Sequence, residues 1–113
     1  MDRLEHVLKF IKKPTSASRG RSAFVYLVGC HGFTKVGVAV DIELRLINLQ
    51  VGNPYEVKLL ASFPSNNAVR DEGRIHAKWK RYEIRGEWFF VPAGELASAM
   101  NADSIAQLID ELP

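Results

Sequence analysis

Several features that define large classes of protein are missing from this sequence of 113 residues. It has a single cysteine, Cys30, so no internal disulfide can form, as is usual in a reducing cytoplasm. No apolar run approaches the roughly 20 residues that a membrane-spanning helix needs. The N-terminus has no hydrophobic signal core, and Asp2 and Glu5 argue against a transit peptide. We therefore expect one cytoplasmic domain with no membrane contact.

The motifs of several enzyme classes are absent as well. The sequence has no Cys-x-x-Cys pair, no glycine-rich phosphate loop and no serine nucleophile motif. Its net charge of +2 is unevenly distributed, because residues 86–113 carry five acidic residues and no Lys or Arg. A basic N-terminal portion and an acidic tail indicate a polyanion-binding side, although the charges can equally mix in space once the chain folds.

The stretch from Phe24 to Ala39 has the pattern of a β-hairpin, in which two runs of aromatic and β-branched residues flank a turn. With Cys30 and His31 in the turn, Tyr26 lies directly opposite Lys35. Alternation places two sets of side chains on opposite faces. One face carries Phe24, Tyr26, Phe33, Lys35 and Gly37, and the other carries Val25, Leu27, Val36 and Val38.

The rest of the chain is read as helices and one further strand. Apolar spacing predicts helices over residues 2–13, 42–50, 68–81, 95–100 and 105–112, with Asp41 as an N-cap. Residues 56–63 alternate as a strand with one apolar face formed by Val57, Leu59, Ala61 and Phe63, and residues 88–91 form a short apolar segment on the sheet. The C-terminal helices are expected to close the core through Leu96, Met100, Ile105, Leu108 and Ile109. The fold class is therefore α+β, a small three-stranded antiparallel sheet flanked by helices.

One helix stripe contains a residue that does not fit a core. Val69, Glu72, Ile75, His76 and Trp79 follow helical spacing, so a carboxylate occupies a position where an apolar residue is expected. A buried carboxylate is costly unless it is paired, hydrogen-bonded or bound to metal. Glu72 and His76 would then share a proton or a metal ion; alternatively, Glu72 reaches solvent and His76 only packs.

These residues resemble motifs of the GIY-YIG nuclease superfamily, in particular its small phage, bacterial and fungal branch with a Lys-Ile/Val-Gly second motif. Phe24-Val25-Tyr26 stands at the Gly-Ile-Tyr position, and Lys35-Val36-Gly37 stands at the Tyr-Ile-Gly position. Arg45 follows at the family's usual interval. Glu72 and His76 match the branch's Glu-x-x-x-His, and the sequence 85–89 matches its closing Gly-Glu-Trp-Phe motif.

The resemblance implies a GIY-YIG-like nuclease domain over residues 23–91, preceded by a helix and basic linker (1–22) and followed by a helical extension (92–113) packed on the same domain. It implies an endonuclease that hydrolyses phosphodiester bonds in DNA with Mg²⁺ or Mn²⁺. Glu72 would bind the metal. Tyr26 would orient or deprotonate the attacking water, and Arg45 would bind the phosphate oxygens.

Other residues have smaller or competing roles in this interpretation. Lys35 replaces the family's second tyrosine, and its charge would lower the pKa of the Tyr26 phenol or bind phosphate directly. His76 would act beside Glu72, and Glu87 is expected to brace its turn rather than bind metal. Arg19 and Arg21 would contact phosphate or remain solvated.

Plainer explanations exist for the same residues. Tyr26 would be a packing residue, Gly37 a point of close approach, and Arg45 a partner of Asp41 or Glu43 on its own helix. The whole chain would then be an inactive nucleic-acid-binding module, or a protein–protein adaptor that uses Trp88, Phe89 and the C-terminal helices. Since nothing in the sequence specifies a DNA sequence, specificity is expected to come from the domain surface or from a protein partner.

Overall fold

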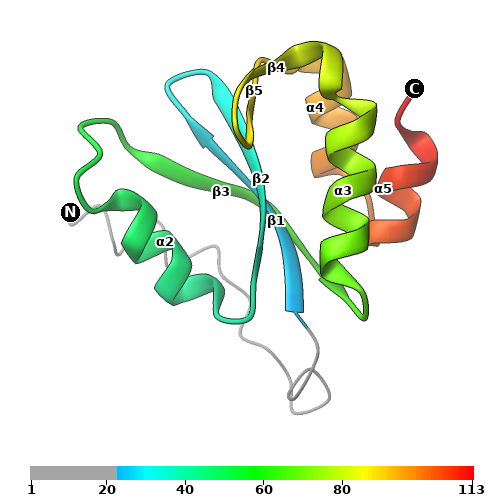
Figure 1. Cartoon of the computed structure of the whole chain (residues 1–113). Coiled ribbons are helices and arrows are strands. Elements are labelled where there is room, and N and C mark those ends of the chain that lie inside the picture. Colours follow the sequence, from blue (N-terminus) through cyan, green and yellow to red (C-terminus); the bar gives the residue numbers. More distant parts are fainter. Residues whose placement is uncertain (1–22) are drawn as a thin grey trace.

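The computed structural model describes residues 23–113, so the helix predicted over residues 2–13 and the two arginines Arg19 and Arg21 lie outside the described part. The fold class is α+β, as predicted. One antiparallel sheet with strand order β3-β1-β2-β5-β4 forms the middle layer (Figure 1). Its strands are β1 (Ala23–Cys30), β2 (Phe33–Ala39), β3 (Val57–Ser65), β4 (Glu83–Arg85) and β5 (Trp88–Phe89).

The sheet has five strands rather than the three that the sequence predicted. The additional strands, β4 and β5, have three and two residues and form a tight hairpin beside β2. Strands this short contain too few residues for alternation to become visible. The apolar segment expected on the sheet is therefore part of the sheet itself.

Helices cover both faces of the sheet (Figure 1). Helix α2 (Ile42–Gln50) lies on one face, and α3 (Ala68–Lys78), α4 (Ala93–Met100) and α5 (Ile105–Glu111) lie on the other. The prediction for α3 extended too far, because the chain leaves the α-helix at Lys78 and continues as the 3₁₀ turn η2 (Lys80–Tyr82). Within residues 23–113, no helix combines the length and apolar character needed to cross a membrane.

The register of the β1–β2 hairpin differs from the predicted one. The turn residues are His31 and Gly32, whose φ angles of 53° and 86° are both positive, as a type I′ hairpin turn of two residues requires. Tyr26 consequently pairs with Gly37, and Lys35 pairs with Val28. The expectation that Tyr26 lies opposite Lys35 is wrong. The shift is two residues along β2, so every side chain keeps its predicted face.

The two faces of the hairpin build two separate cores. Val25, Leu27 and Val36 pack with buried residues of α3 and α5, as the alternation predicted. On the other face, Phe24, Tyr26, Val28, Cys30 and Ala39 pack against Ile42 and Leu46 of α2. Tyr26 and Lys35, the two hairpin residues with predicted catalytic roles, therefore lie on the α2 side of the sheet.

The C-terminal helices close the first core with one exception. Leu108 is buried, and Leu96, Ile105 and Ile109 pack against the same cluster. Met100, which was expected to join them, is 42% exposed.

Strand β3 does not keep one apolar face along its length. The pairing with β1 passes from Leu27↔Ala61 to Val28↔Leu59, which leaves Leu60 as an extra residue in a β-bulge. Val57 and Leu59 therefore join the α2-side core, whereas Ala61 and Phe63 join the other one. The predicted single face is wrong because one inserted residue reverses the alternation.

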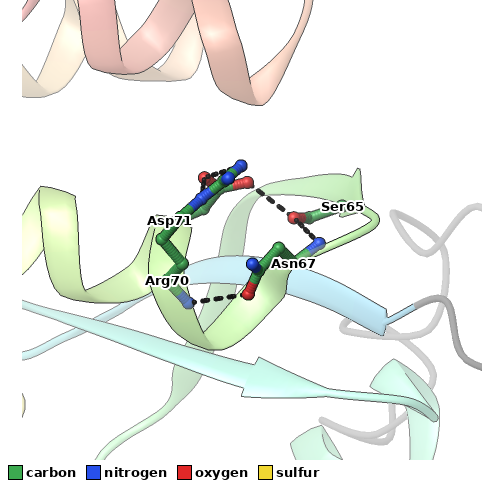
Figure 2. Close-up of polar contacts among 4 residues, drawn as sticks. All are labelled: Ser65, Asn67, Arg70 and Asp71. Carbon is green, nitrogen blue, oxygen red and sulfur yellow. Dashed lines mark hydrogen bonds and ion pairs between the residues drawn. The ribbon is translucent and has the colours of Figure 1, made fainter.

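A buried carboxylate holds the start of α3 against β3 (Figure 2). Asp71 is 5% exposed and accepts a hydrogen bond of 2.6 Å from the Ser65 hydroxyl, whose oxygen accepts from the Asn67 N–H at 3.1 Å. Asn67 is the N-cap and accepts from the Arg70 N–H. Val69, predicted to face inward, is 73% exposed, so the start of the predicted stripe is wrong.

Candidate active site

Tyr26 and Gly37 form a cross-strand pair in which the tyrosine ring lies over the glycine. A Cβ atom added to Gly37 would be 2.4 Å from the Tyr26 hydroxyl oxygen and 2.5 Å from Cζ. Any larger residue would have to displace the ring. One prediction for Gly37 was that another group lies close to the strand at this position. That group is the ring of Tyr26.

Arg45 reaches from α2 to the hydroxyl of this tyrosine. Its Nη1 atom lies 3.5 Å from the Tyr26 hydroxyl oxygen, at the outer limit of a hydrogen bond. Arg45 is exposed and Tyr26 has no exposed surface, so the arginine is the member of the pair that faces solvent. In the described part of the chain Arg45 forms no ion pair with Asp41 or Glu43, and Asp41 instead caps α2 by accepting from the Leu44 N–H.

Lys35 pairs with Glu87 rather than with Tyr26. Its Nζ donates to Glu87 Oε1 at 2.8 Å and lies 5.7 Å from the ring centre of Trp88, its neighbour across the β2–β5 pair. The side chain of Lys35 is 15% exposed and that of Glu87 is 42% exposed. The backbone carbonyl of Glu87 also accepts from the Val36 N–H, so the β4–β5 turn is fixed to β2 at two points.

Glu72 lies on α3 beside this ion pair. Partial burial raises the pKa of its carboxyl, and the negative charge of Glu87 raises that pKa further. His76 and Lys35 lower it, but they do not cancel the increase. The site thus contains a carboxylate whose charge is incompletely compensated by its surroundings.

His76 is fixed by two contacts, one polar and one aromatic. Its Nε2 lies 3.0 Å from the Val36 carbonyl oxygen, and its ring meets the Phe89 ring edge-on at 5.1 Å. A carbonyl can only accept, so Nε2 carries a proton and donates it to Val36, and Nδ1 is the nitrogen left to accept or donate elsewhere. The structure therefore assigns His76 a fixed orientation against β2.

The candidates meet around the middle of β2, and they come from both sides of the sheet. Tyr26, Lys35 and Arg45 belong to the α2 side, whereas Glu72 and His76 come from α3 on the other side. The Tyr26 hydroxyl covers Gly37 on one face, and His76 is bonded to the carbonyl of the adjacent Val36 on the other.

The donor chemistry of the site suits a hard divalent cation. Carboxylate oxygens are the ligands that Mg²⁺ prefers, and Mg²⁺ retains several waters, so one or two carboxylates suffice. The uncompensated charge of Glu72 beside Glu87 favours a cation there. Residues 23–113 contain no group of three or more His, Cys, Asp or Glu side chains placed to bind a metal. A fully protein-ligated metal centre, such as structural zinc, is thus not formed by these residues.

A comparison with models of protein families identifies the family of this domain. Residues 23–103 match the T5orf172 domain, a family of small phage-associated, nuclease-like domains. The chain belongs to the T5orf172 domain family. The match covers the whole sheet, α2, α3, α4 and every candidate site residue except Arg19 and Arg21. No curated protein and no solved structure matches this member of the family.

Trp88 lies beside the candidate site of this T5orf172 domain, although the sequence predicted only a motif residue there. Trp88 provides a ring surface beside Lys35, a contact that depends on β5 pairing with β2. The Gly-Glu-Trp-Phe motif contained the signal, but only the strand pairing shows which residue Trp88 faces.

Proposed function

We propose that this T5orf172 domain is a metal-dependent endonuclease that hydrolyses phosphodiester bonds in DNA. The observation that supports the proposal is that side chains from both faces of the sheet reach the same stretch of β2. Arg45 lies at the Tyr26 hydroxyl, which covers Gly37, and His76 is bonded to the Val36 carbonyl. The charges of Lys35 and Glu87 act on the carboxyl of Glu72. Hydrolysis of a phosphodiester requires a metal-binding oxygen and fixed cations for the developing negative charge. Membership of a nuclease-like family is consistent with this chemistry.

Glu72 would hold Mg²⁺ or Mn²⁺, with Glu87 as the nearest second carboxylate. A divalent ion there would supply Lewis-acid polarisation of the phosphate. The remaining work falls to the protein's own side chains. Because Arg45 is exposed, its planar guanidinium can donate to two non-bridging phosphate oxygens at once.

Tyr26 would act on the attacking water, as the motif implies, or would position Arg45. In the structure it has no exposed surface, and within residues 23–113 its hydroxyl hydrogen-bonds only to Arg45, so action on water requires Arg45 to move away when substrate binds. Tyr26→Phe in an Arg45→Ala background separates the two roles. A general base at Tyr26 predicts a further loss of about 10²–10⁴-fold in cleavage, whereas a tyrosine that acts only by positioning Arg45 predicts no further loss.

Lys35 would fix Glu87 and the β4–β5 turn, and would bind phosphate when that ion pair opens. His76 would accept a proton at Nδ1 while its other nitrogen stays bonded to Val36. The DNA partner, a separate protein partner for specificity and a cytoplasmic location all belong to this proposal.

A second candidate function is a nucleic-acid-binding module without catalysis. It is favoured by the burial of Tyr26, whose hydroxyl cannot reach an attacking water while Arg45 lies against it. Exposed Arg45 would then bind phosphate with no reaction following. An adaptor that presents Phe89 to a partner is not supported, because Phe89 is fully buried in the core.

Plasmid cleavage tests the endonuclease directly. With Mg²⁺ or Mn²⁺, the wild-type protein should convert supercoiled plasmid to nicked or linear DNA, and EDTA should stop the reaction. Glu72→Gln should abolish cleavage, and Arg45→Ala should reduce it by about 10²–10³-fold. The matched controls are Asp110→Asn and Arg74→Ala, which change exposed residues of α5 and α3 away from β2.

Circular dichroism and thermal unfolding should show that all four variants remain folded. If Glu72→Gln and Arg45→Ala both cleave plasmid at the wild-type rate, the assignment of this site is overturned. DNA binding without cleavage under any metal would instead support the binding module.

A further inference from the structure

A second surface feature lies next to the proposed catalytic site. An open groove of about 320 Å³ occupies the end of the sheet where the β1–β2 turn meets the β4–β5 hairpin. Its lining is almost wholly apolar and includes His31, Phe33, Tyr55, Ile84, Arg85 and Trp88. None of these residues has a role in the chemistry proposed above.

The aromatic rings of the groove are accessible rather than part of a core. Tyr55 is 50% exposed, and Phe33 is 36% exposed. The exposed His31 ring stacks on the Tyr55 ring with centroids 4.1 Å apart and an angle of 26° between the planes. Neighbouring exposed rings of this kind form a flat surface on which another planar ring can stack.

The groove is continuous with the proposed phosphate site. Trp88 lines it and also contacts Lys35, with Nζ 5.7 Å from the ring centre. Phe33 lies two residues before Lys35 on the same face of β2, a separation of about 7 Å along a strand. A strand whose phosphate lies near Lys35 would therefore carry a neighbouring base to the groove.

The groove is also lined by a positively charged side chain, that of Arg85. Arg85 is exposed and forms no ion pair with any residue between positions 23 and 113. Stacking rings beside unpaired cations are the combination that single-stranded nucleic acid binds, through its bases and its backbone respectively. A peptide with aliphatic side chains would use the apolar area but would need neither the flat rings nor the Arg85 cation.

We propose that this groove binds an unpaired nucleobase of the strand held at the catalytic site. The inference rests on the proposed function and specifies its substrate class: nucleic acid with unpaired nucleotides beside the cleaved bond, such as a single strand, a flap or a branch. In a continuous duplex the bases stack on one another, so their faces cannot reach the Tyr55 ring.

Tyr55→Leu tests the groove without disturbing its support. The backbone at this position is held independently of the ring, because Tyr55 N donates to Asn53 Oδ1 at 3.0 Å and Tyr55 O accepts from Gln50 Nε2 at 3.1 Å. Leucine keeps an apolar side chain and removes the flat ring. Tyr55→Phe keeps the ring, and Val69→Ala trims an exposed apolar residue of α3 as a surface control.

The measurement is fluorescence anisotropy in EDTA, at one fixed salt concentration, with a labelled single-stranded oligonucleotide and the matching blunt duplex. The wild-type protein should bind the single strand more tightly. Tyr55→Leu should weaken single-strand binding by about 5- to 100-fold and leave duplex binding unchanged. Tyr55→Phe and Val69→Ala should bind like the wild-type protein.

If the wild-type protein and Tyr55→Leu bind the single strand equally, the inference is overturned, even if the protein cleaves plasmid. The groove would then be a binding site for an apolar segment of a protein partner. Failure of the wild-type protein to prefer the single strand would also overturn it. A ring-dependent preference for the single strand in a protein that cleaves nothing would support the groove and reject the nuclease.

Discussion

At the scale of single residues, the site depends on a glycine that makes room for a tyrosine. The Tyr26 ring occupies the space where a Gly37 side chain would begin, and this position brings the hydroxyl under Arg45. The motif that suggested Gly37 gave no reason for the glycine. The reason is a cross-strand contact, which becomes visible only with the correct hairpin register.

Gly37→Ala should therefore damage both stability and the site. The added methyl group would lie 2.4 Å from the Tyr26 hydroxyl oxygen, so the ring must move within a fully packed core. We expect a loss of about 1–3 kcal/mol in the free energy of unfolding, measured by urea denaturation, together with reduced plasmid cleavage.

Gly73→Ala is the matched control for this substitution. Gly73 lies inside α3, and nothing approaches within 4 Å of its added Cβ. Alanine should stabilise the helix there by up to about 1 kcal/mol. If both variants shifted stability equally, the Tyr26 contact would not explain Gly37.

At the scale of elements, local sequence patterns predicted which segments form helices and strands. They predicted less well how the strands pair. Helix α2 and its Asp41 cap follow from spacing and capping chemistry and are confirmed. The hairpin register depended on His31 adopting a positive φ, which is uncommon outside glycine. The reversal of β3 required one extra residue at Leu60, and no periodicity in the sequence marks where a bulge falls.

Helix α3 illustrates the same difficulty within one element. Ile75 and Trp79 are buried as predicted, but in the first turn Ala68 and Asp71 are buried and Val69 is exposed. A carboxylate is buried there because Ser65 supplies a hydrogen bond from the end of β3 (Figure 2). Sequence reasoning assigned the apolar residue to the inside because the partner of Asp71 lies on another element.

Removing this carboxylate should loosen the junction between β3 and α3. In Asp71→Ala the buried Ser65 hydroxyl loses its charged acceptor, a contact worth about 1.5–3 kcal/mol. Urea denaturation should show that loss. The exposed Asp110→Ala should change stability by no more than about 0.5 kcal/mol. Equal effects of the two substitutions would mean that the Ser65–Asp71 bond contributes nothing.

At the scale of the whole molecule, one sheet separates two cores and brings functional side chains from both sides to β2. The sequence allowed Tyr26, Lys35, Arg45, Glu72 and His76 to be singled out, since each breaks an apolar pattern or matches a family motif. It did not show that Lys35 pairs with Glu87, because that contact depends on the pairing of β5 with β2. The catalytic roles of all these residues remain predictions.

The raised pKa of Glu72 has a consequence for the stability of the whole molecule. Below the ordinary pKa of a glutamate, the carboxyl is neutral in both the folded and the unfolded state. As the pH rises through the raised folded-state pKa, the folded protein must hold a charge that burial and Glu87 disfavour, and stability falls. Glu72→Gln should therefore raise Tm at neutral pH, and that gain should disappear below about pH 4.

A bound cation would remove this penalty, so Mn²⁺-dependent thermal unfolding at neutral pH is the most direct test of the metal site. In EDTA, Glu72→Gln should have a higher Tm than the wild-type protein. Mn²⁺ at ten times its Kd should stabilise the wild-type protein by about 1.4 kcal/mol and should leave Glu72→Gln unchanged. An equal shift in both proteins, or no shift in either, would contradict a metal-dependent site at Glu72.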